Sequence, residues 1–356
     1  MFIQIKGVGM TSSLLRFFIF YTTSVQAEIQ SKDFIFSVRR IIALTFILFF
    51  VPALIVWNHT GFILDDVLYP DWRDTHIDRP LFLVGNARSG TTWLHRLIAQ
   101  DSDNFTSFLC WEILFGVSIT WRRVFICLYE FDKRYLFGLQ FEVISMIENC
   151  LVGGVKVHKV GLQEYEEDEW LMIHIFLNQL VLLFFPLGGG IHYSLPSFDK
   201  ADKSDLPVYI RKQIFTYYKE CVQRHLYARS GNYGGLKSKI FVSKNPAFTM
   251  RLEMLYETFP GCRIACLLRD PMQSIPSMIS YIAMVCSVLL GTMLFYFILF
   301  IIILCEFISF HLILFYAIFV YSILLHFSLC PLLFWPCSDS SSITPLFIPD
   351  SIAPVI

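Results

Sequence analysis

Charged residues are scarce in this chain of 356 residues. Asp, Glu, Lys and Arg make up 16% of it, against about 25% in a typical soluble domain. Apolar residues reach 55%, which excludes intrinsic disorder and disfavours a wholly soluble cytosolic protein. The formal net charge is −1, so no global field attracts nucleic acid, and we expect no nucleic-acid partner. Any anionic ligand needs a local site.

Cysteine pairs of the metal-binding or redox type are also missing. The ten cysteines include no C-x-x-C pair, and Cys262 and Cys266 are the closest two. This spacing does not support a zinc ribbon or a redox motif. We expect mostly buried, apolar cysteines and no metal cofactor.

Basic residues are absent after Arg269. Residues 282–337 are an almost unbroken series of Phe, Leu, Ile, Val, Tyr, Cys and Ser, and residues 338–356 form a short tail. One interpretation is a pair of further membrane helices. The other is a gene-model artefact, because T-rich codons encode most of these residue types and no basic residue flanks the segment, as natural spans usually require.

An uncharged apolar run occupies residues 41–57, with Arg39 and Arg40 before it and Asp65 after it. The run is at the short end for a membrane-spanning helix. The positive-inside rule would place residues 1–40 in the cytoplasm and the following domain in a lumen. We therefore expect a single-pass membrane anchor. A buried core helix and a late signal sequence are the alternatives.

Residues 75–281 have the pattern of an α/β domain. Pro80 is followed by the apolar run LFLVG, a glycine-bearing loop and a segment with helical spacing of its apolar residues. We expect further strands at 240–242 and 263–268, a helix between them at 249–258, and a buried helix at 171–187. Strands that alternate with helices predict a parallel sheet flanked by helices, in which ligands bind beyond the carboxyl ends of the strands.

The loop after the first expected strand has the spacing G-x-x-x-x-G-T-T from Gly85 to Thr92. An ATP- or GTP-binding P-loop needs lysine after the second glycine, where this chain has Thr91. The remaining features are those of a phosphate cradle, with backbone N–H groups, hydroxyls and a helix N-terminus. Arg88 adds a planar cation that suits phosphate or sulfate oxygens.

The segment LVGNARSGTTWLHRLI resembles the 5′-phosphosulfate loop of sulfotransferases that use 3′-phosphoadenosine-5′-phosphosulfate (PAPS). The segment FVSKNPAFTMRLEMLYETFPGCRIACLLRDPMQSIPSMIS resembles the 3′-phosphate segment of the same family. HKVGLQEYEEDEWL is similar to an acidic segment of its membrane-anchored and bacterial-type branch. The resemblance covers roughly residues 78–281 and implies a P-loop-like α/β fold.

The resemblance also implies a reaction and its residues. The sulfuryl group of PAPS would pass in line to an acceptor hydroxyl or amine, on a carbohydrate, a lipid or a small alcohol, without a metal and in the Golgi lumen. Arg88 would be catalytic, in the place of the cytosolic branch's lysine. The residues implied to bind the 5′-phosphosulfate are Arg88, Ser89, Gly90, Thr91 and Thr92. Arg269 and Ser277 are implied to bind the 3′-phosphate.

A base must take the acceptor's proton. Six candidates lie in one short segment: His158, Glu164, Glu166, Glu167, Asp168 and Glu169. Crowded carboxylates raise one another's pKa, which suits acid/base chemistry. Among these candidates we favour Glu167 and His158. The alternative is a solvated, acidic helix start. Lys244 either binds the cofactor or simply ends a strand, and His95 is expected at the surface of the first helix.

Two other functions stay open. The resemblance stops near Tyr281, where the family continues with soluble sequence, so the chain is alternatively an inactive membrane protein with an incomplete domain. A nucleotide or phosphosugar kinase with a variant phosphate loop is a further alternative, which the missing lysine at position 91 disfavours.

Overall fold

The computed structural model describes residues 8–30, 38–135, 137–138, 142, 144–146, 161–177, 208–229 and 239–281. All of these lie in the first of two compact units, Met1–Leu299 and Phe300–Ile356. The candidate base His158, the apolar segment 282–337 and the tail 338–356 lie outside the described residues.

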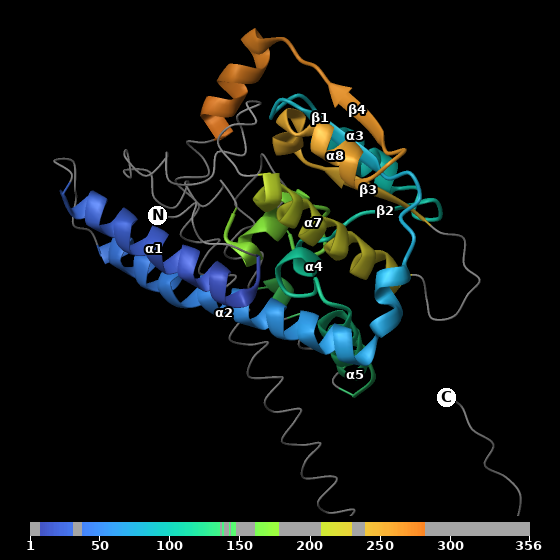
Figure 1. Cartoon of the computed structure of the whole chain (residues 1–356), viewed down its shortest axis with the longest axis horizontal. Helices are drawn as coiled ribbons and strands as arrows, with labels where there is room; N and C mark the ends of the chain where they lie inside the picture. The colour runs from blue at the N-terminus through green and yellow to red at the C-terminus, as the bar shows by residue number, and fades with distance from the viewer. Residues whose placement is uncertain are drawn as a thin grey trace, which may run out of the picture. The chain divides into compact units, whose positions relative to one another are not determined.

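The described domain contains a four-stranded sheet with the order β2-β3-β1-β4, which lies to one side of α1, α2 and α5 (Figure 1). Its strands are β1 (Leu81–Gly85), β2 (Phe105–Thr106), β3 (Ile240–Lys244) and β4 (Arg263–Leu267). All strand pairs are parallel, and Leu81 is aligned with Val242 on one side and Arg263 on the other. The expected parallel sheet is confirmed, and Phe82 and Val84 of its central strand are fully buried.

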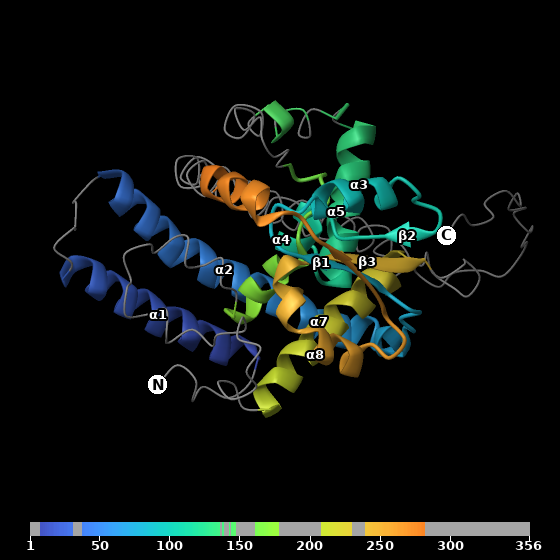
Figure 2. The same ribbon diagram turned by 90° about the horizontal axis from the view of Figure 1, so that it is seen from above.

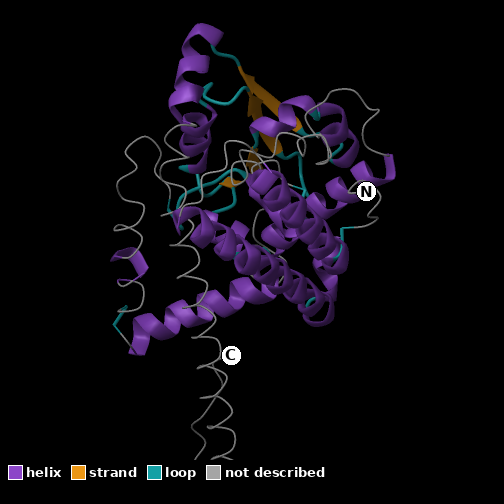
Figure 3. Cartoon of the chain, turned by 90° about the vertical axis from the view of Figure 1, so that its left-hand side faces the viewer, coloured by secondary structure: helices purple, strands orange, loops and turns teal. Residues whose placement is uncertain are grey.

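Helices pack beside this sheet, and α1 and α2 extend away from it (Figures 2 and 3). The α-helices are α1 (Met10–Gln30), α2 (Val38–Leu68), α3 (Thr91–Ala99), α4 (Cys110–Leu114), α5 (Ile119–Tyr135), α7 (Val208–Arg229) and α8 (Leu252–Thr258). The 3₁₀ helices are η2 (Pro70–Asp74), η3 (Asp168–Ile175) and η5 (Pro246–Met250), and residues 271–281 are also helical. Helix α3 packs on β1, β2 and β3, and α7 contacts α5, α8 and η3.

Two expected helices differ from the prediction. The helix expected at 249–258 is split, because Asn245 caps a 3₁₀ turn by accepting from the Ala247 N–H at 3.0 Å, and α8 starts only after Arg251. The segment expected to form a helix from residue 171 contains η3 instead, which ends where Phe176 adopts a φ of 49°. The remainder of that segment, from residue 178, is not among the described residues.

The apolar run 41–57 is part of the much longer helix α2. Residues Leu44–Leu68 are long and apolar enough to cross a membrane, but 56% of the apolar window is buried inside the protein. Asp65, expected beyond the membrane edge, lies within the helix and is fully buried. Its Oδ2 lies 3.2 Å from Nε of Arg224 on α7. A core helix passes the same test of length and composition, so the spanning anchor stays a prediction.

Candidate functional site

The phosphate loop leaves the sheet at the carboxyl end of β1. Gly85 has a φ of +133°, and a Cβ there would collide with the carbonyl oxygen of Leu267 on β4. Its N–H donates to Thr249 Oγ1 at 2.9 Å. Gly90 has a φ of +99° and precedes α3, which begins at Thr91. Because only glycine adopts such backbone angles without strain, both glycines of the predicted motif have a local structural reason.

The interior of the loop is a set of donors next to a helix N-terminus. The N–H of Ser89 donates to the carbonyl of Asn86 at 3.2 Å, which closes the turn. Arg88 has a φ of 67°. Ser89 Oγ is shielded from solvent and has no hydrogen-bond partner among the described residues. A buried hydroxyl without a partner is costly, and an anionic oxygen in the loop would supply one.

Arg88 connects the two predicted motifs. Its Nε donates to Ser277 Oγ at 3.0 Å, and its guanidinium carbon lies 5.3 Å from the centre of the Tyr281 ring. The carbonyl of Arg88 accepts from Arg269 Nη1 at 3.1 Å. Residues more than 180 positions apart are therefore in direct contact. Their predicted roles toward a 5′-phosphosulfate and a 3′-phosphate stay predictions.

Lys244 ends β3 and also lies at the loop. The strand register aligns it with Leu83, two residues before Gly85. The side chain is almost fully buried, and its Nζ donates to Thr92 Oγ1 at 3.0 Å. The same Nζ is 2.9 Å from Glu167 Oε1. Lys244 ends the strand, as one interpretation holds, and its ammonium lies at the loop. Binding of the cofactor by this lysine stays a prediction.

The acidic segment lies against this cation. Burial raises the pKa of Glu166 to about 7, with the Glu167 carboxylate adding to the rise and the Lys244 ammonium opposing it. Asp168 is 2% exposed and accepts a hydrogen bond from the Tyr218 hydroxyl. Burial raises its pKa to about 7 as well.

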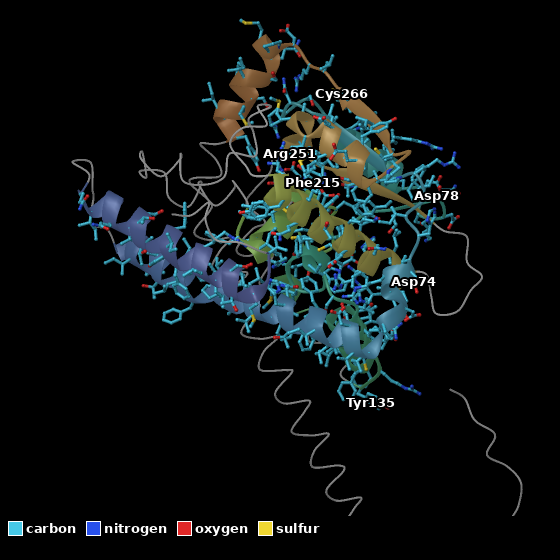
Figure 4. The ribbon with its side chains drawn as sticks, in the orientation of Figure 1. Asp74, Asp78, Tyr135, Phe215, Arg251 and Cys266 are labelled. Carbon is cyan, nitrogen blue, oxygen red and sulfur yellow. The ribbon has the colours of Figure 1, made fainter. Side chains whose placement is uncertain are left out.

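Glu169 is buried behind the same segment. Its Oε2 lies 3.3 Å from Asn245 Nδ2 and 3.4 Å from Arg251 Nη1. Figure 4 labels Arg251 just above Phe215 of α7. Asp168 and Glu169 are thus core groups, so the alternative of a solvated helix start is wrong for these two. Glu166 and Glu167 remain partly accessible to solvent.

His95 is buried, not at the surface as expected. It is 1% exposed, and its Nε2 lies 2.9 Å from Ser107 Oγ. Burial, reinforced by the Lys244 and Arg96 cations, lowers the pKa of His95 to about 3, so the ring is neutral near pH 7. His95 is four residues from Thr91 and four from Ala99, two small residues that are also buried on α3. This helical spacing is the signal in the sequence that could have placed His95 on the inner face of the helix.

Sequence reasoning also missed Tyr281, which ends the described helix next to Arg88. Burial and the carboxylates of Glu167 and Glu166 raise its pKa to about 12. Within the described residues, no group of three or more His, Cys, Asp and Glu side chains is arranged to hold a metal ion. The expectation of a metal-free reaction stays a prediction.

Comparison with known proteins supports the fold. No protein-family model and no curated protein sequence matches the chain. The solved structure of a sulfotransferase from Mycobacterium tuberculosis H37Rv (STF1) is similar, with a TM-score of 0.50 and 18% identity over 74% of this chain and 64% of the other. A sulfotransferase from Mycobacterium avium (STF9) matches with a TM-score of 0.45 and 18% identity, over 74% and 65%.

The chain therefore spans less than two thirds of the length of either sulfotransferase. An identity of 18% shows similarity of fold alone. The described domain has a parallel-sheet α/β fold of the sulfotransferase type.

Proposed function

We propose that this chain is a sulfotransferase that moves the sulfuryl group of PAPS to an acceptor hydroxyl or amine. One observation carries the proposal. Arg88 after β1 and Arg269 after β4 are in contact, and Lys244 at the end of β3 lies at the same carboxyl end of the sheet, beside Glu166 and Glu167. The sulfotransferase-type fold supports this assignment.

The residues present fit an anionic donor. The unpartnered hydroxyl of Ser89 and the N–H groups at the start of α3 suit the oxygens of a 5′-phosphosulfate. Arg88 contributes a fixed cation, held by Ser277 Oγ. Arg269 is exposed beside the loop, where its fork can bind a second phosphate. This pairing of two cationic positions suits a nucleotide with phosphates at both the 5′ and the 3′ position.

Transfer would require charge neutralisation and a base. Arg88 and Lys244 would neutralise the charge that develops on the phosphate oxygen as its bond to sulfur breaks. Glu167 would accept the proton of the acceptor hydroxyl as the new sulfur–oxygen bond forms. The products would be the sulfated acceptor and 3′-phosphoadenosine-5′-phosphate, and the bound proton would then pass to solvent.

The acceptor class and the location are further proposals. A carbohydrate, a lipid or a small alcohol would each supply the required hydroxyl. A location in the Golgi lumen would require residues 41–57 to span a membrane, and it competes with the membrane-surface placement of α2 proposed below. The prediction of a span rests on the sequence, where two arginines precede the apolar run.

Binding of the product nucleotide tests the proposal on the full chain. We expect 3′-phosphoadenosine-5′-phosphate at about 100 times its Kd to raise the free energy of unfolding by roughly 2.7 kcal/mol. ATP at the same concentration should have little effect. Arg88→Ala should lose the stabilisation. Arg263→Ala should keep it, because this exposed arginine lies at the opposite end of β4 from Arg269.

Two results would contradict the proposal. Equal or stronger stabilisation by ATP would favour the kinase alternative. No stabilisation of a folded sample by either nucleotide would favour the inactive protein with an incomplete domain.

A further inference from the structure

Helix α2 has two unlike faces, and the inner one is tied to the domain by polar contacts. Asn58 Nδ2 donates to the carbonyl of Leu114 at 2.9 Å, and His59 Nε2 lies 3.1 Å from the carbonyl of His174. Asp65 accepts from the N–H of Thr120 at 2.8 Å and is paired with Arg224. This face is thus part of the protein core.

The outer face exposes a line of large apolar side chains. Ile42, Phe49, Val56 and Ile63 are 49%, 62%, 42% and 60% exposed, and they recur at intervals of seven residues. Since two helical turns take about 7.2 residues, they lie on one side of the helix over about 32 Å. No charged residue occurs from position 41 to position 64. We call these four side chains the apolar stripe.

The pattern around the stripe disfavours a second copy of the chain as its partner. A coiled coil needs apolar residues at two positions of each heptad, spaced by three and four. Three residues after the stripe residues the chain has Thr45, Pro52, His59 and Asp66, which include a proline and a charged residue. Four residues after them it has Phe46, Ala53, Thr60 and Val67, of which Phe46 is buried in the core and Thr60 is polar. Neither set supplies a second exposed apolar position in every heptad.

A membrane span formed by Leu44–Leu68 disagrees with the inner face. A helix that spanned the membrane with these residues would expose Asn58, His59 and Asp65 to hydrocarbon, where polar and ionised groups are costly. It would also separate Asp65 from Arg224, leaving a buried arginine without this partner. The hydrogen bonds of the inner face can persist only if α2 stays on the domain.

We propose that the apolar stripe binds the surface of a lipid bilayer, with the axis of α2 parallel to the membrane plane. The outer side chains enter the boundary between headgroups and acyl chains, as the apolar face of an interfacial helix does. The inner face keeps its contacts with the domain. One continuous lipid-facing side then explains why α2 is long and why residues 41–64 lack charge, two features that it shares with a spanning segment.

Depth-dependent fluorescence quenching tests this placement on the full chain. A fluorescent amino acid is incorporated at position 49, 56 or 63, and the protein is added to phosphatidylcholine vesicles with bromine either near the headgroups or near the bilayer centre. We expect the shallow bromines to quench all three positions more strongly, and to the same extent. A fluorophore at the exposed position 256 of α8 should be unaffected by either lipid.

Other depth profiles would overturn the proposal. Positions 49 and 63 are about 21 Å apart along the axis, so a spanning helix would give graded depths with one position quenched from the bilayer centre. Absence of quenching at all three positions, even in protein that sediments with the vesicles, would show that other segments bind the lipid.

A triple variant provides a second measurement. Phe49→Asn with Val56→Asn and Ile63→Asn should abolish quenching of a fluorophore at the exposed position 60. The matched control, Leu252→Asn with Tyr256→Asn, changes exposed apolar residues of α8. The fluorophore at position 60 should be quenched in this control as strongly as in the unmodified chain. Full quenching in the triple variant would contradict the proposal, as would stripe-dependent self-association without quenching.

Discussion

At the residue scale, one lysine of the candidate site contacts both the phosphate loop and the acidic segment. Lys244 Nζ lies within 3.0 Å of Thr92 on the phosphate loop and of Glu167 in the acidic segment. An almost fully buried ammonium requires such partners, because an unpaired buried charge is strongly unfavourable. Glu167 is consequently held at the loop, where the proposed reaction would need a base.

Replacing Glu167 tests its role as the base. Glu167→Gln should lower kcat for sulfuryl transfer by about 10²- to 10⁴-fold, and the affinity for 3′-phosphoadenosine-5′-phosphate should stay within a few-fold. Steady-state kinetics and nucleotide titration give the two quantities. The matched variant is Glu166→Gln on the neighbouring residue. If kcat is unchanged in Glu167→Gln but collapses in Glu166→Gln, the base is Glu166.

At the scale of elements, the position of the loop follows from the close pairing of β1 with β4. Gly85 is aligned with Leu267, and the backbone of Leu267 occupies the space that a side chain at Gly85 would need. The glycine spacing alone predicted a flexible phosphate cradle. It did not reveal that Gly85 is required by a neighbouring strand far away in the sequence. A Cβ at Gly90, in contrast, would meet no described atom within 4 Å, so this glycine is required by its φ.

Alanine at the two glycines should separate these causes. Gly85→Ala should lower the free energy of unfolding by at least about 2 kcal/mol, from strain and collision together. Gly90→Ala should cost about 1 kcal/mol, from backbone conformation alone. Urea denaturation of both variants measures the difference. Equal losses would mean that the Leu267 backbone moves away without cost.

At the scale of the whole molecule, the acidic segment links the site to the stability of the domain. Burial raises the pKa of Asp168 and of Glu166 to about 7, above their ordinary values of 3.8 and 4.5. Between these values the folded state binds more protons than the unfolded state. The free energy of unfolding must then decrease as pH rises, because deprotonation is easier in the unfolded chain.

We therefore expect the stability that depends on these two groups to be fully present below about pH 4 and to decrease as the pH rises from there to about pH 7. Asp168→Asn should flatten this decrease, while Asp74→Asn, at an exposed aspartate, should not. Urea midpoints measured between pH 5 and pH 8 give the profile. A profile in Asp168→Asn as steep as in the wild type would show that Asp168 is already ionised at pH 5.

The sequence by itself determined the parallel α/β class and the turn between β1 and α3, because short apolar runs, glycine spacing and helical periodicity are local signals. Only the tertiary structure decided which side chains meet. The contact of Arg88 with Ser277 and the burial of His95 depend on strands and helices distant along the chain.

Helix α2 shows the same division. Composition detects an apolar run, but it does not distinguish a face that packs on protein from one that remains exposed. The partner of Asp65 is Arg224, more than 150 residues away, and only the packing of α7 against the domain brings that guanidinium to the helix. Long-range contacts of this kind arise from the balance of many weak interactions, which no local pattern encodes.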